Sequence, residues 1–230
     1  MRRIILAVLA LVIFLTSSTK GQDSSELAGK KSEVLDLFLS GDSTPPLEYS
    51  VTRFFEAGAT ISGYEALMEV ETNISPERGF TFHIVSESGS GRTREQLHNF
   101  LEEEKETIEK NEGDKARLTP QNYTFNLSGE ESGVWKLGLR AKGKSKLLVN
   151  GNLFVDPAGE LLRLEGKMAK SPSWKLSDVQ IVRNYKRIAG VRLPTRMEST
   201  AKVRWLPIRA KLTVRYEYKS VNYIDLTTVE

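Results

Sequence analysis

The chain has 230 residues, of which 39% are hydrophobic and 27% charged, so it is long enough to form one large domain without metal or disulfide staples. It contains no cysteine, which excludes disulfides, thiolate catalysis, thiolate metal sites and a thiol-linked lipid anchor. Residues 1–21 carry three basic and no acidic side chains, which accounts for the formal net charge of +3. The remaining chain is balanced, and it lacks the basic excess that a nucleic-acid partner requires.

Residues 1–21 are typical of a secretory signal peptide. Arg2 and Arg3 precede an unbroken apolar run over 4–15, and small polar residues follow. The run is shorter than the roughly 20 residues of a membrane-spanning helix. We therefore predict export to the periplasm, cleavage, and a soluble single domain of residues 22–230. A helix that stays in the membrane as an anchor is the alternative.

The next residues predict one helix and then three strands. Over 24–39 the apolar residues form a partial helical stripe that ends before Gly41. Strands are predicted at 47–57, 64–74 and 79–87. In the first of them Arg53 shares one face with the apolar residues Tyr49, Val51 and Phe55.

A second helix is predicted from Thr93 to about residue 110. Thr93 and Gln96 have the spacing of a capping box, which places the start of the helix at Thr93. The helix has a narrow apolar stripe, and its acidic residues are expected to face water. The stripe comprises Leu97, Phe100, Leu101 and Ile108, and the acidic residues are Glu102, Glu103, Glu104 and Glu106. Such a helix is expected to lie on a sheet.

The rest of the chain reads as antiparallel strands joined by tight turns. The strands are predicted at 122–127, 134–141, 146–150, 151–155, 160–166, 174–187, 191–205 and 208–221. Asp156, Pro157 and Gly159 occupy the positions that a type I turn prefers. Trp205 ends its strand and is expected on the apolar face of the sheet.

This order predicts a mainly β (α+β) fold: a strongly curved antiparallel sheet that forms an open half-barrel of about ten strands, lidded by two helices. The absence of a βαβ rhythm argues against a parallel doubly wound sheet. Two helices cannot cover so many strands flatly, so a curved sheet is expected to wrap around them and leave an apolar cavity. A fully packed core is the alternative.

The cavity prediction rests on named residues from the sheet face and the second helix. Arg53 is expected to act there as an inward-facing polar tie, or else to lie at a barrel edge. The predicted lining consists of Tyr49, Val51, Phe55, Met68, Val70, Phe82, Phe100, Leu101, Leu212 and Val214.

The sequence offers little catalytic chemistry. Its two histidines, His83 and His98, fall on a strand and a helix without a supporting motif, and the common nucleophile, zinc and phosphate-loop motifs are absent. We predict no catalytic residue, no metal site, no cofactor and no enzymatic activity. Asn-x-Ser/Thr sequons occur at Asn73, Asn122 and Asn126, and they matter only in a glycosylating host.

The layout resembles the periplasmic lipoprotein-carrier fold, shared by outer-membrane lipoprotein-sorting proteins and the sensor domain of an anti-sigma-factor regulator. Ser75-Pro76-Glu77-Arg78-Gly79-Phe80 is similar to the family's R-P-x-x-F motif, although Ser75 and Thr81 stand where the family has arginines. Stretches at 151–165, 170–173 and 187–194 are similar to a group of uncharacterised exported bacterial proteins. The family resemblance implies a concave apolar face, lidded by helices, that takes up acyl chains.

We therefore predict a non-catalytic periplasmic binding or carrier protein for an acyl chain, a lipid or a lipidated protein. The alternative is an envelope-stress or assembly module of the same fold that binds a protein partner. An open apolar groove favours lipid, and a packed core favours the protein partner. An outer-membrane barrel and an uncharted hydrolase remain as further alternatives. The acidic helix and the absence of a C-terminal aromatic residue weaken the barrel.

Overall fold

The computed structural model describes residues 22–41, 47–75, 78–110 and 112–223. The predicted signal peptide, residues 1–21, lies outside the described residues. Within the described part no helix is long and apolar enough to cross a membrane. The elements are α1 (Gln22–Ser40), β1 (Leu47–Ala59), β2 (Ala66–Ser75), β3 (Gly79–Gly89), α2 (Gly91–Glu109), η1 (Glu112–Ala116), β4 (Tyr123–Glu131), β5 (Val134–Ala141), β6 (Val149–Val155), β7 (Leu161–Met168), β8 (Leu176–Ile188), β9 (Val191–Val203) and β10 (Arg209–Tyr223).

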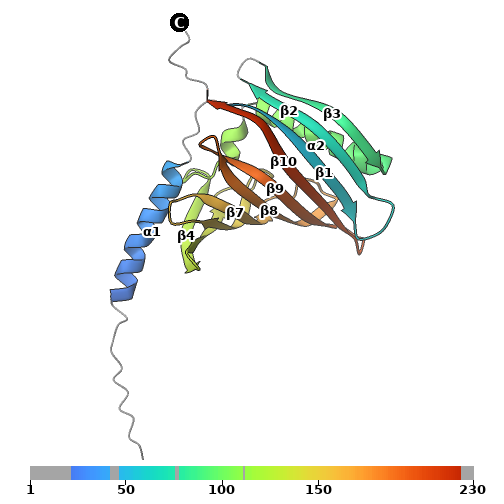
Figure 1. Ribbon diagram of the computed structural model, residues 1–230. Coiled ribbons are helices and arrows are strands. Elements are labelled where there is room, and N and C mark those ends of the chain that lie inside the picture. The colour runs from blue at the N-terminus through green and yellow to red at the C-terminus, as the bar shows by residue number, and fades with distance from the viewer. Residues whose placement is uncertain (1–21, 42–46, 76–77, 111, 224–230) are drawn as a thin grey trace, which may run out of the picture.

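All ten of these strands form one antiparallel sheet in the order β3-β2-β1-β10-β9-β8-β7-β6-β5-β4. The chain runs as a meander from β4 to β10, and β10 then pairs with β1, so the first and last strands meet inside the sheet. The two outer strands, β3 and β4, do not pair with each other, and the sheet stays open. Figure 1 shows the sheet strongly curved, with α2 lying across β1–β3. The predicted fold class is confirmed.

The strand register aligns one row of side chains across nine strands on the inner face. Period-two alternation makes this row apolar almost throughout, which is why the face is covered by helices. A single charged residue, Arg183 of β8, interrupts it. The row runs Met68, Phe55, Val214, Met197, Arg183, Leu164, Leu153, Leu137 and Leu127.

The inner face carries two core clusters, each covered by a different helix. Leu97 and Leu101 of α2 are buried on β1–β3 and the adjoining strands, in a cluster with Phe55, Met68, Val70, Met197 and Val214. Val34 and Phe38 of α1 are buried at the other end, in a cluster that includes Tyr123, Trp135, Leu137, Leu153, Val155 and Leu161. The two helices therefore stabilise opposite ends of the sheet and leave its middle less tightly covered.

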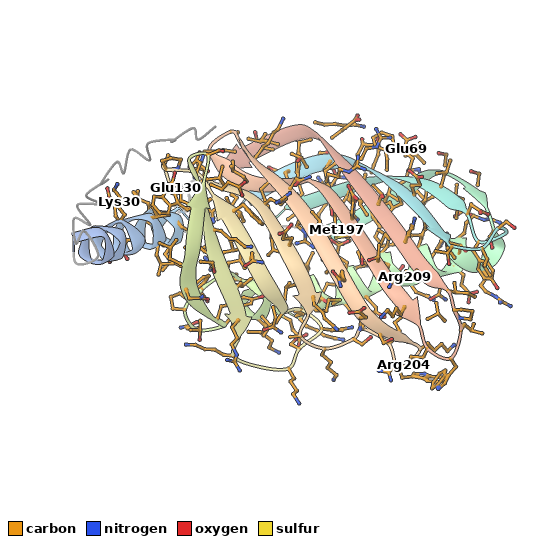
Figure 2. All side chains as sticks on the ribbon, turned by 90° about the horizontal axis from the view of Figure 1, so that it is seen from below. Lys30, Glu69, Glu130, Met197, Arg204 and Arg209 are labelled. Carbon is orange, nitrogen blue, oxygen red and sulfur yellow. The ribbon has the colours of Figure 1, made fainter. Side chains whose placement is uncertain are left out.

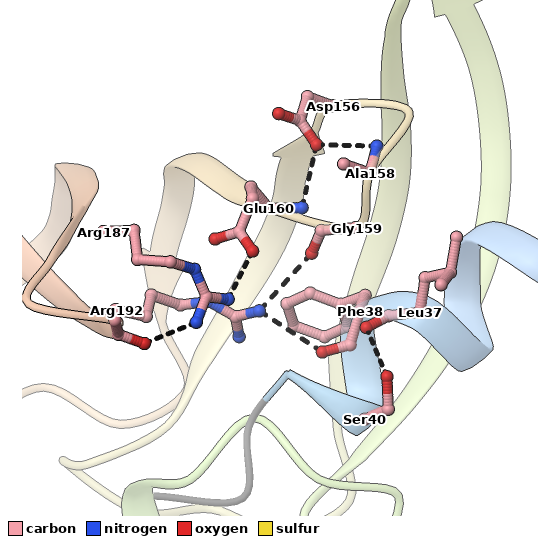
Figure 3. A network of polar contacts seen from close by, with 10 residues as sticks. Leu37, Phe38, Ser40, Asp156, Ala158, Gly159, Glu160, Arg187 and Arg192 are labelled. Carbon is pink, nitrogen blue, oxygen red and sulfur yellow. Dashed lines mark hydrogen bonds and ion pairs between the residues drawn. The ribbon is translucent and has the colours of Figure 1, made fainter.

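The C-terminal end of α1 docks on the turn between β6 and β7 (Figure 3). Asp156 closes this turn as predicted, because its Oδ1 accepts hydrogen bonds from the backbone N–H groups of Ala158 and Glu160. Gly159 has φ +84°, and a Cβ there would lie 2.7 Å from the Leu37 carbonyl carbon. Arg192 holds the helix end: its guanidinium donates to the Phe38 carbonyl oxygen at 3.3 Å and lies 4.7 Å from the Phe38 ring centroid. The turn glycine thus serves both the turn and the docking of α1.

Two predicted boundaries were wrong. α2 begins at Gly91, and its N-cap Ser90 forms no side-chain cap hydrogen bond. The Thr93 hydroxyl instead donates to the Tyr64 carbonyl oxygen at 2.8 Å, so tertiary contact replaces the predicted capping box. The strand predicted at 146–150 does not exist as such. Residues 142–148 form a loop with a turn at Ser145, and β6 begins at Val149 and continues into the strand predicted at 151–155.

Candidate functional site

A cavity of about 560 Å³ lies between α2 and the middle of the sheet. Its floor comes from β6–β10, where the strand alternation turns apolar side chains inward. The floor includes Val149, Leu164, Met168, Val179, Ile181, Met197, Ala201, Ala210 and Leu212. The cavity lies where the two core clusters meet, since its floor shares Val149 and Leu164 with the cluster beneath α1 and Met197 with the cluster beneath α2.

The roof of the cavity is formed by α2 and two loops. Phe100, Thr107 and Ile108 face it from α2, and Leu118 and Leu147 face it from the segments around η1 and before β6. Phe100 nevertheless keeps 37% of its surface exposed. The roof therefore leaves part of the Phe100 side chain uncovered. Removing such apolar surface from water by binding an apolar ligand is favourable.

The structure divides the residues predicted to line the cavity. Phe100 and Leu212 line it. Five others are packed together where α2 meets the sheet: Phe55, Met68, Val70, Leu101 and Val214. Phe82 packs against that cluster, and Val51 is buried on β1. Tyr49 stacks edge-on against Tyr218, at a centroid distance of 5.8 Å.

Most of the floor comes from β6–β9, residues that the sequence reasoning did not select. A usable signal is present in β8, where Val179, Ile181, Arg183 and Tyr185 alternate with outward-facing side chains. A charged residue in such an apolar row, as Arg53 is in β1, indicates a polar group that the fold shields from solvent.

Arg53 ties the lid helix to the sheet. Its side chain is 3% exposed, and its Nη1 lies 2.6 Å from Oε2 of Glu104 on α2. Its Nε donates to the Thr72 hydroxyl at 2.9 Å, and its Cζ lies within 6 Å of the ring centroids of Phe55 and Phe80. Glu104 was predicted to face water; its side chain keeps 34% of its surface exposed, but its carboxylate pairs with the buried cation beneath the helix, which the sequence analysis did not foresee.

Arg183 supplies a half-buried positive charge on the cavity floor. Its Nη2 contacts the Met197 sulfur at 3.4 Å, while its buried Nε has no hydrogen-bond partner among the described residues. Tyr185, the next residue on the same face, raises the pKa of Arg183 above its ordinary value, so the group stays charged. No described carboxylate forms an ion pair with it, because Glu104 pairs with Arg53 and Glu103 pairs with Lys146 at 2.8 Å.

A tyrosine cluster borders Arg53 on β1 and β10. Tyr216 and Tyr218 stack with ring centroids 6.5 Å apart, and the Tyr218 hydroxyl donates to the Pro194 carbonyl oxygen at 3.0 Å. Burial raises the pKa of Tyr49, Tyr216 and Tyr218, since a phenolate would lose its hydration there.

We expect this cluster to make the protein alkali-sensitive. Above about pH 10 the unfolded chain ionises its tyrosines while the folded chain keeps these protonated, so the folded state binds more protons and stability falls as pH rises. Each tyrosine contributes at most about 1.4 kcal/mol per pH unit. Urea unfolding between about pH 9 and pH 11 checks this. Tyr218→Phe is expected to flatten the decline, whereas Tyr64→Phe, outside the cluster, is not. An unchanged slope in Tyr218→Phe would contradict the assignment.

The histidines do not form a shared site. His83 is exposed on β3, and His98 of α2 contacts Glu87 at 2.6 Å, where Arg94 also binds. The resulting contacts hold the pKa of Glu87 below its usual value, chiefly through the hydrogen bond to His98. Over the described ranges no group of three or more His, Asp or Glu side chains has the arrangement of a metal site.

Comparisons with known proteins reveal distant similarity only. No family model matches the chain, and no curated protein matches it. A solved structure of a LolA superfamily protein from Nitrosomonas europaea is 12% identical, with a TM-score of 0.43, covering 85% of this chain and 94% of that one. A DUF1329 family protein from Desulfovibrio piger is also 12% identical, with a TM-score of 0.39 and coverages of 87% and 95%. Both similarities concern the fold alone.

Proposed function

We propose that this protein is a non-catalytic binding or carrier protein that holds one acyl chain, with an anionic head group, in the cavity between α2 and β6–β10. The observation that carries the proposal is the largely apolar floor of this cavity, interrupted by Arg183 and, at the rim, by Lys211. Glu103, Glu104 and Lys146 line the opposite side. The proposal includes export to the periplasm and a single domain of residues 22–230.

The size of the cavity favours one chain over two. Its 560 Å³ lies within the range of about 300–1,000 Å³ that small-molecule sites occupy. If a methylene group takes about the same space as a water molecule in the liquid, roughly 30 Å³, the cavity holds about 18 such groups. One acyl chain of ordinary length with a small head group fits this volume, whereas a two-chain phospholipid exceeds it.

The energetics are compatible with reversible binding. About 15 methylene groups leaving water contribute roughly 12 kcal/mol at about 0.8 kcal/mol each. Lost ligand freedom and displacement of the roof subtract a large part of this. A carrier requires such a balance, because it must release what it binds.

The charge distribution favours an anionic head group. A carboxylate or phosphate beside the Arg183 guanidinium would form charge-assisted hydrogen bonds away from bulk water. The acyl tail would then run along the strands, over Ile181 and Val179 toward Ala201 and Ala210. The ion pair of Arg53 and Glu104 would keep α2 closed over the bound chain.

A cavity-filling substitution tests the proposal. Ser199 lies on the floor of the cavity, opposite Leu212 of β10 and Ile181 of β8, and Ser199→Phe places a ring in the space assigned to the acyl chain. We expect binding of radiolabelled palmitate in equilibrium dialysis to fall at least about 30-fold, which corresponds to the loss of roughly 2 kcal/mol of ligand contact. Native mass spectrometry of protein purified without detergent is expected to show acyl adducts in the unmodified protein and none in Ser199→Phe.

The matched control is Thr200→Phe, which adds the same ring to the outer face of the same strand. It is expected to bind palmitate normally. Thermal unfolding shows whether each variant is folded. Undiminished palmitate binding by folded Ser199→Phe would overturn the cavity assignment. An unmodified protein that neither carries nor binds an acyl species would favour the protein-partner alternative.

A further inference from the structure

We propose that an exposed tryptophan-bearing tip of the sheet docks on an anionic phospholipid bilayer. The Trp tip consists of Trp174, Lys175, Arg204, Trp205 and Leu206, from the segment before β8 and the β9–β10 hairpin. The two segments are joined by a hydrogen bond from the Arg204 N–H to the Lys175 carbonyl oxygen at 2.8 Å. Figure 2 shows Arg204 at the end of the long strands, away from α1.

The aromatic residues of the tip are turned outward. Trp174 is 69% exposed and Trp205 77% exposed, with ring centroids 5.5 Å apart. Leu206 is also exposed beside them. Trp205 was predicted on the apolar face of the sheet, and this was wrong, because the strand ends at Val203 and the hairpin turns the ring into solvent.

The backbone of Trp205 supports a functional reason for this exposure. Its φ is +63°, a left-handed conformation that bulky side chains rarely adopt and that glycine or asparagine would take more easily. A tryptophan in this conformation lowers the stability of the folded state, and burial of its ring does not compensate, because the ring is exposed. Trp rings are favoured at the boundary between water and lipid, where both the apolar ring and the indole N–H find partners.

The charges around the tip select an anionic surface. Residues 170–177 and 199–211 carry six basic and no acidic side chains. Lys202 pairs with Asp178 at 3.1 Å, whereas Lys175, Arg204 and Arg209 form no ion pair with a described residue. A hollow of about 640 Å³ lies here, and its charged lining residues are Lys202, Arg204 and Arg209. Basic residues beside exposed indoles match the head groups and the acyl boundary of an anionic leaflet.

The tip also adjoins the cavity, since Pro172 and Leu176, which flank Trp174 in sequence, line the cavity. If the proposed function holds, docking would bring the apolar end of the cavity to the membrane surface. The docking itself does not depend on that function.

Vesicle binding tests the proposal. The protein, expressed from its full sequence, is mixed with phosphatidylcholine vesicles with or without phosphatidylglycerol, and sedimentation measures the bound fraction. We expect binding only to the anionic vesicles, weakening as salt is added. Trp174→Ser combined with Trp205→Asn is expected to lower affinity at least about 10-fold. Lys175→Gln combined with Arg204→Gln is expected to lower it about 30-fold.

Matched controls lie elsewhere on the sheet. Leu67→Ser removes an exposed apolar side chain of β2, and the pair Lys136→Gln and Arg140→Gln removes two exposed charges of β5. These variants keep residues 1–21, so any vesicle binding through that basic and apolar segment is the same in all of them. They are expected to bind vesicles as the unmodified protein does. Ser199→Phe is also expected to bind vesicles normally, so failure of the cavity proposal and failure of the docking proposal remain distinguishable.

A fluorescence measurement on the unmodified protein avoids any dependence on variant folding. The chain has three tryptophans, and the third, Trp135, is buried in the cluster beneath α1. Lipids brominated in their acyl chains are expected to quench the emission of the unmodified protein and not that of the double tryptophan variant. Any of three results would overturn the proposal. The first is equal quenching in the unmodified protein and the double tryptophan variant, and the second is equal binding to neutral and anionic vesicles. The third is a protein that binds no vesicles and instead forms a dimer that the tryptophan substitutions dissociate.

Discussion

Replacing Glu104 by leucine is expected to lower the free energy of unfolding by about 3 kcal/mol, because it leaves the Arg53 guanidinium buried without its counter-ion. The reciprocal change, Arg53→Met, is expected to cost only about 1–2 kcal/mol, since the Glu104 side chain is 34% exposed and water can solvate it. The asymmetry is the distinctive result, because an exposed surface pair would lose about the same small amount from either side.

Combining the two substitutions is expected to restore most of the loss. Methionine and leucine replace a buried charge pair by apolar side chains, a change that is often neutral for stability. Urea unfolding of the two single variants and the double variant forms a double-mutant cycle that measures the coupling directly. Glu102→Leu, on the exposed face of α2, is the control and is expected to change stability by less than about 0.5 kcal/mol. A loss below about 1 kcal/mol in Glu104→Leu would show that the pair does not hold the helix.

Arg183→Met is expected to lower affinity for palmitate by about 10–100-fold while leaving affinity for hexadecanol, which has the same chain and no charge, nearly unchanged. The physical reason is the loss of a charge-assisted hydrogen bond inside the cavity, worth about 1.5–3 kcal/mol. Methionine keeps much of the length of the arginine stem and adds no charge, so the apolar part of the cavity is retained. Removal of a half-buried cation that forms no ion pair with a described residue is expected to leave stability unchanged or raised.

Equilibrium dialysis with both ligands provides the measurement, and Lys211→Met is the matched control. Lys211 also lines the cavity, yet it is exposed at the rim, so its loss is expected to change palmitate affinity less than about threefold. Equal weakening for the acid and the alcohol in Arg183→Met would indicate a loss of packing and contradict the head-group assignment. An unchanged affinity for both would remove Arg183 from the site.

Much of the fold follows from local patterns in the sequence. Alternation with period two predicts the strands of the meander, and helical periodicity predicts both helices to within a few residues. The turn at Asp156 is predicted because its Asp, Pro and Gly act within a few residues of one another. The excess of apolar strand faces over helices predicts a curved, open sheet, since a covered face must meet something apolar.

What local patterns do not contain is the register across the sheet and the path of loops over it. Glu104, the ion-pair partner of Arg53, is 51 residues away in the chain. It lies on a helix whose acidic residues are all predicted from the sequence to face solvent. Trp205 ends a run that alternates like a strand, and only the actual end of β9 decides that its ring faces solvent.

By itself the sequence determined the two α-helices, most of the strands and the presence of a polar residue on the inner face, because these depend on residues close together in the chain. Only the tertiary structure decided where the inner face stays open. The predicted lining from β1 and β2 is covered by α2, whereas the cavity forms over β6–β10, between the two core clusters. That outcome depends on where each helix docks, which is set by contacts between residues far apart in the chain, such as Phe38 with Arg192 and Arg53 with Glu104.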